Sequence, residues 1–106
     1  MCLNCHLENK NQTSKFAQSL INYEESAHGM AILRGNQKAA VCVDCHGVHK
    51  LQRASVPTSK INHYNIPDLC GKCHTELTDE DMKSIHGRAL KKGSKDSPNC
   101  TYCHSE

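Results

Sequence analysis

The sequence predicts a mainly α fold with extensive loops and little or no sheet. Three observations support this prediction. Apolar residues recur every three or four positions in two segments, 13–35 and 78–93, as in amphipathic helices. The 106-residue chain has no Trp, one Phe and only 37% hydrophobic residues, so its supply of core side chains is poor. One short motif occurs four times and uses all eight cysteines.

That motif is CxxCH, as in Cys42-Val-Asp-Cys45-His46, and it is the attachment signature of a c-type haem. Each thiol adds to a vinyl group of the porphyrin, and the imidazole that follows binds the iron. The predicted attachment residues are Cys2, Cys5, Cys42, Cys45, Cys70, Cys73, Cys100 and Cys103, and the predicted proximal ligands are His6, His46, His74 and His104. The sequence therefore predicts four covalent haem c groups, with a few helices wrapped around a packed haem stack.

Zinc is the alternative, since four CxxC pairs could form two sites of four thiolates each. Zinc does not require a histidine after each pair. With eight histidines in 106 residues, chance would place one after all four pairs only about three times in 100,000. We therefore favour haem. No cysteine then remains for a disulfide or a catalytic thiol, and we expect the chain without haem to be largely unfolded.

The N-terminal third is expected to hold one haem and one helical segment. The first motif starts at residue 2, which places its haem at an end of the molecule. Thr13 and Ser14 are candidate N-caps for a helix that ends near Gly35, either continuous or in two parts. His28 lies on the apolar face of this segment.

The middle of the chain is expected to be irregular. His49 follows His46 by three residues and so stays on the proximal side of its own haem, where it can serve only a neighbouring iron. Residues 50–60 have no clear period and predict a loop. His63 precedes the third motif, and Pro67 is expected to exclude a regular helix just before that motif.

The second helical segment is predicted to begin at Thr78, with acidic residues in its first turn, and to end at Gly93. His86 lies on its apolar face. A basic cluster near its end is read as a solvated face, with a docking patch as the alternative. The cluster consists of Arg88, Lys91, Lys92 and Lys95.

The two helical segments are copies of each other. Residues 26–31 and 84–89 both read SxHGxA, and in each copy the next haem motif begins 14 residues after the histidine. The whole of 26–46 resembles 84–104. We expect one domain, residues 1–106, with an internal repeat. Whether Ser26 and Ser84 cap a helix, pack near the haem ring or lie on the surface stays open.

The histidines outside the motifs match in number the four sixth coordination positions. They are His28, His49, His63 and His86. We expect all four to be distal axial ligands, which would make every haem bis-histidine, low-spin and low in potential. A consistent pairing is His28 with His46, His86 with His104, His63 with His74, and His49 with His6. A competing pairing sends His28 to the first haem and His49 to the third.

The chain resembles the small multihaem cytochromes c of the tetrahaem class. The resemblance rests on the four CxxCH motifs, on CVDCHGVH at 42–49 and on the paired ESAHG and KSIHG segments. It implies electron transfer with protein partners, such as other cytochromes, a membrane quinol dehydrogenase or a terminal reductase. Relatives act as periplasmic shuttles, as modules of larger reductases or as subunits of extracellular filaments. This chain departs from them in ending shortly after His104 without a following GxH.

Charge and compartment follow from the haems. Eight propionates and four ferric irons would change the formal charge of +2 to about −2 when oxidised and about −6 when reduced. The composition therefore gives no support to nucleic-acid binding. Haem c is attached outside the cytoplasmic membrane, so we expect an exported periplasmic or extracellular protein. No signal peptide is visible in this chain, and no stretch reaches the roughly 18 apolar residues of a membrane span.

These observations predict an electron-transfer protein rather than an enzyme, with electrons hopping between four closely spaced haems. A periplasmic or extracellular shuttle is favoured, and a subunit of an extracellular filament is the alternative. A small haem reductase is a further alternative, which requires one iron to be left open. His49 or His63 would then not be a ligand.

Overall fold

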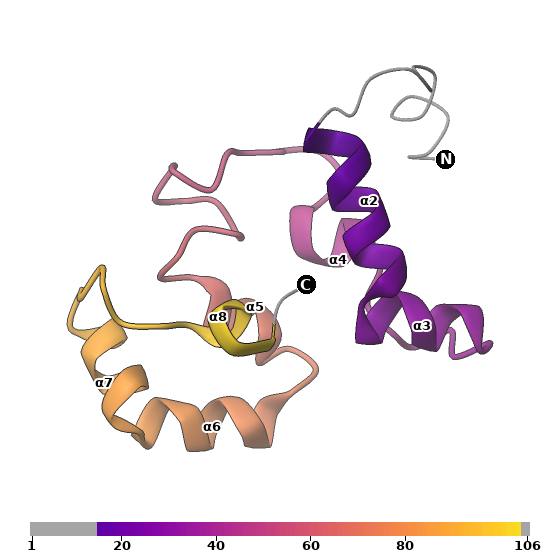
Figure 1. Ribbon diagram of the computed structural model, residues 1–106. Helices are drawn as coiled ribbons and strands as arrows, with labels where there is room; N and C mark the ends of the chain where they lie inside the picture. The colour runs from indigo at the N-terminus through magenta and orange to yellow at the C-terminus, as the bar shows by residue number, and fades with distance from the viewer. Residues whose placement is uncertain (1–14, 105–106) are drawn as a thin grey trace. The chain divides into compact units, whose positions relative to one another are not determined.

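The structure is a computed structural model that describes residues 15–104 (Figure 1). These residues form helices joined by loops and contain no strand. The helices are α2 (Lys15–Glu25), α3 (Ala27–Leu33), α4 (Cys42–His46), α5 (Ile66–Cys70), α6 (Thr75–Lys83), α7 (Ile85–Lys91) and α8 (Cys100–His104). The chain divides into two compact units, one ending at Ala40 and the other running from Val41. The mainly α fold is thus confirmed for the described residues, while the single domain stays a prediction.

The first helical segment is two helices with a break at Ser26. Ser26 leaves the helical conformation, with φ −72° and ψ 165°. Its hydroxyl accepts the Gly29 N–H at 3.2 Å and donates to the Tyr23 carbonyl at 2.7 Å. Ser26 is therefore the N-cap of α3, which satisfies one of the amides left unpaired at a helix start. The cap candidates Thr13 and Ser14 lie outside the described residues.

The second helical segment repeats this break at Ser84. Its φ of −67° and ψ of 168° match those of Ser26, and its hydroxyl accepts the Gly87 N–H at 3.1 Å. The predicted start at Thr78 was wrong, because α6 begins at Thr75. The Thr78 N–H donates to the His74 carbonyl at 3.0 Å, so the helix begins immediately after the last residue of the third haem motif.

Each break requires the glycine that follows the histidine. A Cβ at Gly29 would collide with the Tyr23 carbonyl oxygen and lie 2.9 Å from the Glu24 Cα. A Cβ at Gly87 would collide with the Asp81 carbonyl oxygen. The two helices of each pair therefore cross so closely that only glycine fits between them.

Both helix pairs end in the same left-handed turn. Gly35 has φ 87° and Gly93 has φ 88°, a region that favours glycine. The amide that follows the glycine donates to the Ala31 carbonyl at 2.9 Å in the first copy and to the Ala89 carbonyl at 3.1 Å in the second. This is a Schellman ending, which satisfies carbonyls at the helix C-terminus.

Helix α5 corrects the prediction made from Pro67. This proline lies in the first turn of α5, where its missing N–H has no helical partner to lose. Pro67 and Ile66 are both buried. Pro67 therefore lies inside a short helix that ends at the first cysteine of the third haem motif, and α5 packs against α6 and α8.

The loop over residues 50–60 is confirmed, and polar side chains hold it in place. Asn62 Nδ2 donates to the Ala54 carbonyl at 2.8 Å, and Asn65 Nδ2 donates to the Ser59 carbonyl at 2.8 Å. Ser59 and Asn62 are both buried. Side-chain to backbone hydrogen bonds thus fix the loop against the residues on either side of His63.

The described residues bury little apolar surface. Among residues 18–104, Ile66 and Leu90 are the large hydrophobic residues with less than a tenth of their surface exposed. Many others are exposed, for example Leu33 at 74%, Ile85 at 76% and Tyr102 at 80%. Burial of apolar surface is the main driving force of folding. The side chains of residues 18–104 therefore contribute little of this stabilisation.

Candidate haem-attachment sites

The three described CxxCH motifs each form one helical turn. The second motif is α4 and the fourth is α8. The third begins at the last residue of α5, and the His74 N–H donates to the Cys70 carbonyl at 2.9 Å. Residues at positions i, i+3 and i+4 share a helix face, so two thiols and one imidazole lie on the same side. The first motif, with Cys2, Cys5 and His6, lies outside the described residues.

Local contacts stabilise the turn of the second motif. Asp44 Oδ2 accepts the Val41 N–H at 2.8 Å, which fixes the start of α4. Gly47, with φ 80°, ends the helix. His46 and His49 are both exposed. Asp44, one of the two residues between the cysteines of this motif, therefore has a structural role.

Asn99 stabilises the turn of the fourth motif, and our sequence reasoning missed this residue. Its Oδ1 accepts the Thr101 N–H at 3.1 Å and the Thr101 hydroxyl at 2.8 Å. Asn99 is thus the N-cap of α8. Asparagine directly before a helical CxxCH motif is the signal that could have identified it.

Cysteines from different motifs lie close together. Burial, and then the neighbouring Cys100 and Cys45, raise the pKa of the Cys70 thiol to about 11. Cys70 is the last residue of α5 and Cys100 is the first residue of α8, and these two helices pack against each other. The structure therefore brings together the first attachment positions of the third and fourth motifs, and Cys70 is held as a neutral thiol.

The predicted iron ligands differ in exposure. His46, His74 and His104 are exposed, as are His49 and His86, whereas His28 is half-buried. His28 and His86 occupy the same position, the second residue of α3 and of α7, directly after equivalent serine caps. The repeated spacing in the sequence is therefore a repeated placement in the structure.

Two of the predicted distal histidines meet the same short segment, residues 97–99. The Ser97 hydroxyl donates to the His86 carbonyl at 2.8 Å. Asn99 Nδ2 donates to the His63 carbonyl at 3.0 Å. The structure thus brings both His63 and His86 to the residues that lead into the fourth motif.

The pairings of the distal histidines with individual haems stay predictions. His28 and His46 belong to different compact units of the chain. Within the first unit, the Tyr23 hydroxyl donates to the Ala40 carbonyl at 2.8 Å and ties α2 to the residues that lead into the second motif.

The His63 ring offers one nitrogen suited to iron. Its Nδ1 lies 3.2 Å from Asn99 Nδ2, while its Nε2 is buried and has no hydrogen-bond partner. A buried polar atom without a partner is uncommon and costs free energy. With two thiols and an imidazole on one face of each of the three described motifs, this nitrogen adds to a donor set that fits covalent haem c.

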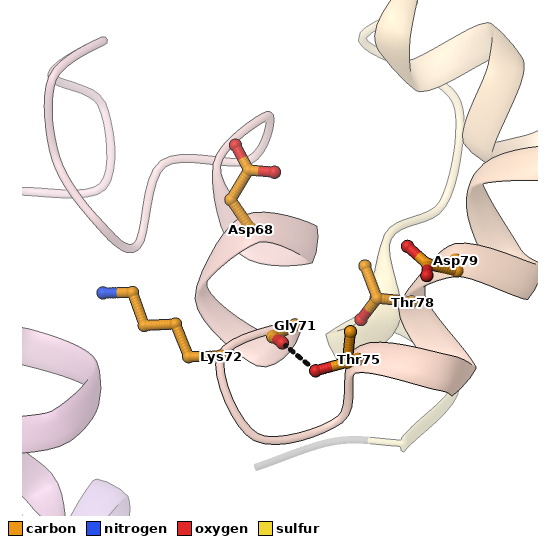
Figure 2. A pocket seen from close by; sticks show the side chains of 6 residues that line it. All are labelled: Asp68, Gly71, Lys72, Thr75, Thr78 and Asp79. Carbon is orange, nitrogen blue, oxygen red and sulfur yellow. Dashed lines mark hydrogen bonds between the residues drawn. The ribbon is translucent and has the colours of Figure 1, made fainter.

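A shallow cavity of about 290 Å³ lies beside the third motif, between α5 and α6 (Figure 2). The Thr75 hydroxyl donates to the Gly71 carbonyl at 3.1 Å across it. Figure 2 shows the Lys72 side chain extending away from Thr75 and Thr78. Its lining residues are Asp68, Gly71, Lys72, Thr75, Thr78 and Asp79. Their polar groups do not converge on one point, so we assign no chemistry to this cavity.

Comparison with known protein families gives a match, whereas comparison with individual proteins does not. Neither the curated proteins nor the solved structures include a match to this chain. The family of NrfB-like c-type cytochromes matches residues 2–93, a range that includes the first three motifs and both helix pairs but ends before the fourth motif. No helix within residues 15–104 is long and apolar enough to cross a membrane. The match covers most of the sequence, and the chain belongs to the NrfB-like family of c-type cytochromes.

Proposed function

We propose that this cytochrome is an electron-transfer protein with four bis-histidine haem c groups and no enzymatic activity. One observation supports the number four above the others. The fourth motif lies beyond the family match, yet it forms a five-residue helix, α8, just as the second motif forms the five-residue helix α4. Covalent haem at each motif would supply a one-electron centre, and four centres within 106 residues would lie within hopping distance of one another.

Coordination by histidine on both faces suits this role. A carrier needs iron whose ligands change little between the ferric and ferrous states, and two imidazoles provide this. The equivalent placement of His28 and His86 supports their assignment as distal ligands. The buried Nε2 of His63 supports a third. His49 is the fourth by number, as the remaining histidine outside the motifs.

The proposed setting is the periplasm or the cell exterior. Its partners would be redox proteins, namely other cytochromes, a quinol dehydrogenase or a terminal reductase. The haem propionates would give the loaded protein a net negative charge, so a partner with a basic docking surface fits best.

Haem content and carbon monoxide binding test the proposal on a single sample. We expect four haems per chain by pyridine haemochrome assay and mass spectrometry. We also expect no spectral shift when CO is added to the dithionite-reduced protein, because every iron would be closed by histidine. Fewer than four haems would overturn the haem count. A shift in a quarter of the haem would show one open iron and favour the reductase alternative.

A further inference from the structure

We propose that Asn99 is a positioning residue that holds the His63 imidazole for iron and joins it to the helix bearing the fourth haem motif. The inference rests on the proposed function, because it requires His63 to be a distal ligand. Asn99 comes directly before Cys100, yet it contacts a histidine 36 residues earlier in the chain.

The oxygen and the nitrogen of the Asn99 carboxamide contact two different segments of the chain. Its oxygen caps α8 through the Thr101 N–H and hydroxyl, at 3.1 and 2.8 Å. Its nitrogen donates to the His63 carbonyl at 3.0 Å and lies 3.2 Å from Nδ1 of the ring. The side chain is only 8% exposed. A buried amide with partners at both ends fixes the distance and orientation between the two segments it joins.

The His63 ring is braced on another side by Tyr64. The two rings meet edge to face, with centroids 5.1 Å apart and planes at 80°. The Tyr64 hydroxyl donates to the Gly93 carbonyl at 3.2 Å, which connects these two rings to the turn that ends the helix pair α6 and α7. Nε2 is the ring nitrogen that these contacts leave without a partner. The contacts that hold the ring therefore involve its other atoms and leave Nε2, the nitrogen proposed to bind iron, without a hydrogen bond.

The proton on the ring gives this contact a chemical consequence. Iron bound at Nε2 requires the lone pair there, so the ring proton must sit on Nδ1 and needs an acceptor. In the structure Asn99 presents its NH₂ to Nδ1, which suits the opposite tautomer. A half-turn of the carboxamide places Oδ1 against Nδ1–H, at the expense of the bonds to the His63 carbonyl and the Thr101 N–H. Coordination at His63 is thus coupled to the state of Asn99.

Two substitutions of Asn99 separate positioning from simple capping. Asn99→Asp has an oxygen at each end, so it keeps the cap of α8 and accepts Nδ1–H without a turn, while it loses the bond to the His63 carbonyl. A carboxylate partner makes the imidazole a stronger donor to iron. Asn99→Ala removes both contacts. Thr101→Ala is the matched control, because it removes the hydroxyl contact to Asn99 Oδ1 and leaves the contacts with His63 in place.

The measurements are redox titration, electron paramagnetic resonance and CO difference spectra of the purified holoproteins. We expect Asn99→Asp to lower the potential of one haem in four and to leave all four low-spin. We expect Asn99→Ala to raise the potential of that haem or to open it to CO. Thr101→Ala should match the wild type. The inference is overturned if the Asp and Ala variants shift the potential in the same direction or leave it unchanged.

His63→Ala distinguishes failure of this inference from failure of the proposed function. If the wild type does not bind CO and His63→Ala binds CO at a quarter of its haem, His63 is a ligand. Asn99 variants with unchanged potential and unchanged CO binding would then refute the role of Asn99 alone. If the wild type itself binds CO in a quarter of its haem and His63→Ala changes nothing, the bis-histidine assignment fails as well. His63 would then retain its proton on Nε2.

Discussion

Single side chains set the geometry around each haem motif. Ser26 and Ser84 stop one helix and start the next, Asp44 begins the turn of the second motif, and Asn99 begins that of the fourth. Each acts by pairing a backbone amide that a short helix leaves unsatisfied. Five-residue helices contribute little stability of their own, so such caps matter more here than in a long helix.

Replacing the serine caps tests this at the residue scale. Ser84→Ala and Ser26→Ala should each lower the free energy of unfolding of the holoprotein by about 1 kcal/mol, because each leaves a helix amide unpaired. Denaturant unfolding followed by circular dichroism measures the loss. Ser55→Ala, at an exposed loop position, is the control and should be nearly neutral. Equal effects at all three sites would argue against the capping role.

Iron ligation is also decided residue by residue. His28→Ala and His86→Ala should each open one haem in four to CO, because equivalent placement predicts equivalent roles. A CO difference spectrum of each reduced holoprotein measures the open fraction. Gln37→Ala, at an exposed position without a ligand role, is the control and should stay closed. A closed His86→Ala variant beside an open His28→Ala variant would show that the two copies of the repeat have diverged in function.

At the scale of elements, the recurring unit is a helix, a serine break, a second helix bearing histidine, and a glycine turn. The first copy comprises α2 and α3, and the second comprises α6 and α7 (Figure 1). Each fixed residue of the SxHGxA pattern other than histidine has a structural explanation. The serine caps the second helix, and the glycine permits the two helices to cross closely. The alanine carbonyl accepts the hydrogen bond that closes the glycine turn. The histidine is the second residue of the second helix in both copies, and this equivalent placement supports the proposal that both copies use it in the same way.

The glycines of this unit should differ in sensitivity. Gly87→Ala should cost more than about 2 kcal/mol of unfolding free energy, because its Cβ would meet backbone atoms that cannot move aside. Gly93→Ala should cost about 1 kcal/mol, because it has open space and only its left-handed φ is strained. Denaturant unfolding of the two holoproteins gives the comparison. A Gly87→Ala variant as stable as the Gly93→Ala variant would mean that the crossing can relax.

At the scale of the whole molecule, residues 18–104 build little core of their own. Two large apolar side chains are buried among these residues, and most of their other burial is polar. The two compact units of the chain are joined at the segment leading into the second motif. Covalent haem would add both apolar mass and negative charge to such a chain, so stability and net charge should both depend on attachment.

The unattached chain should therefore be largely unfolded. A variant with all eight cysteines changed to serine cannot form thioethers, and its far-ultraviolet circular dichroism should show little of the helix seen in the holoprotein. The holoprotein measured in the same buffer is the control. A cooperative thermal transition in the variant would contradict the prediction, because it would show that side chains alone suffice.

Attachment should also reverse the sign of the charge. At pH 7 the formal charge is +2 without haem, and we expect about −2 in the oxidised and −6 in the reduced holoprotein. The holoprotein should therefore bind an anion exchanger, and more tightly when reduced, whereas the serine variant should pass through. Retention that does not change on reduction would mean that proton uptake compensates each electron.

Local chemistry explains what the sequence alone determined. The CxxCH spacing, the SxHGxA repeat, the predominance of helix and the loop at 50–60 all follow from residues a few positions apart, where covalent geometry and hydrogen-bonding patterns leave few choices. Helix boundaries were less secure. Pro67 suggests a break in the sequence, yet it lies in the first turn of α5, where proline is tolerated. The start of α6 at Thr75 depends on the fold of the third motif.

The tertiary structure alone decided the contacts between distant segments. The bond from Asn99 to His63 joins residues 36 positions apart, and Cys70 meets Cys100 only because α5 packs against α8. No periodicity encodes such pairs, since they depend on how the intervening loops close. The sequence thus named the groups that would bind haem, and the folded chain determined which of them share a neighbourhood.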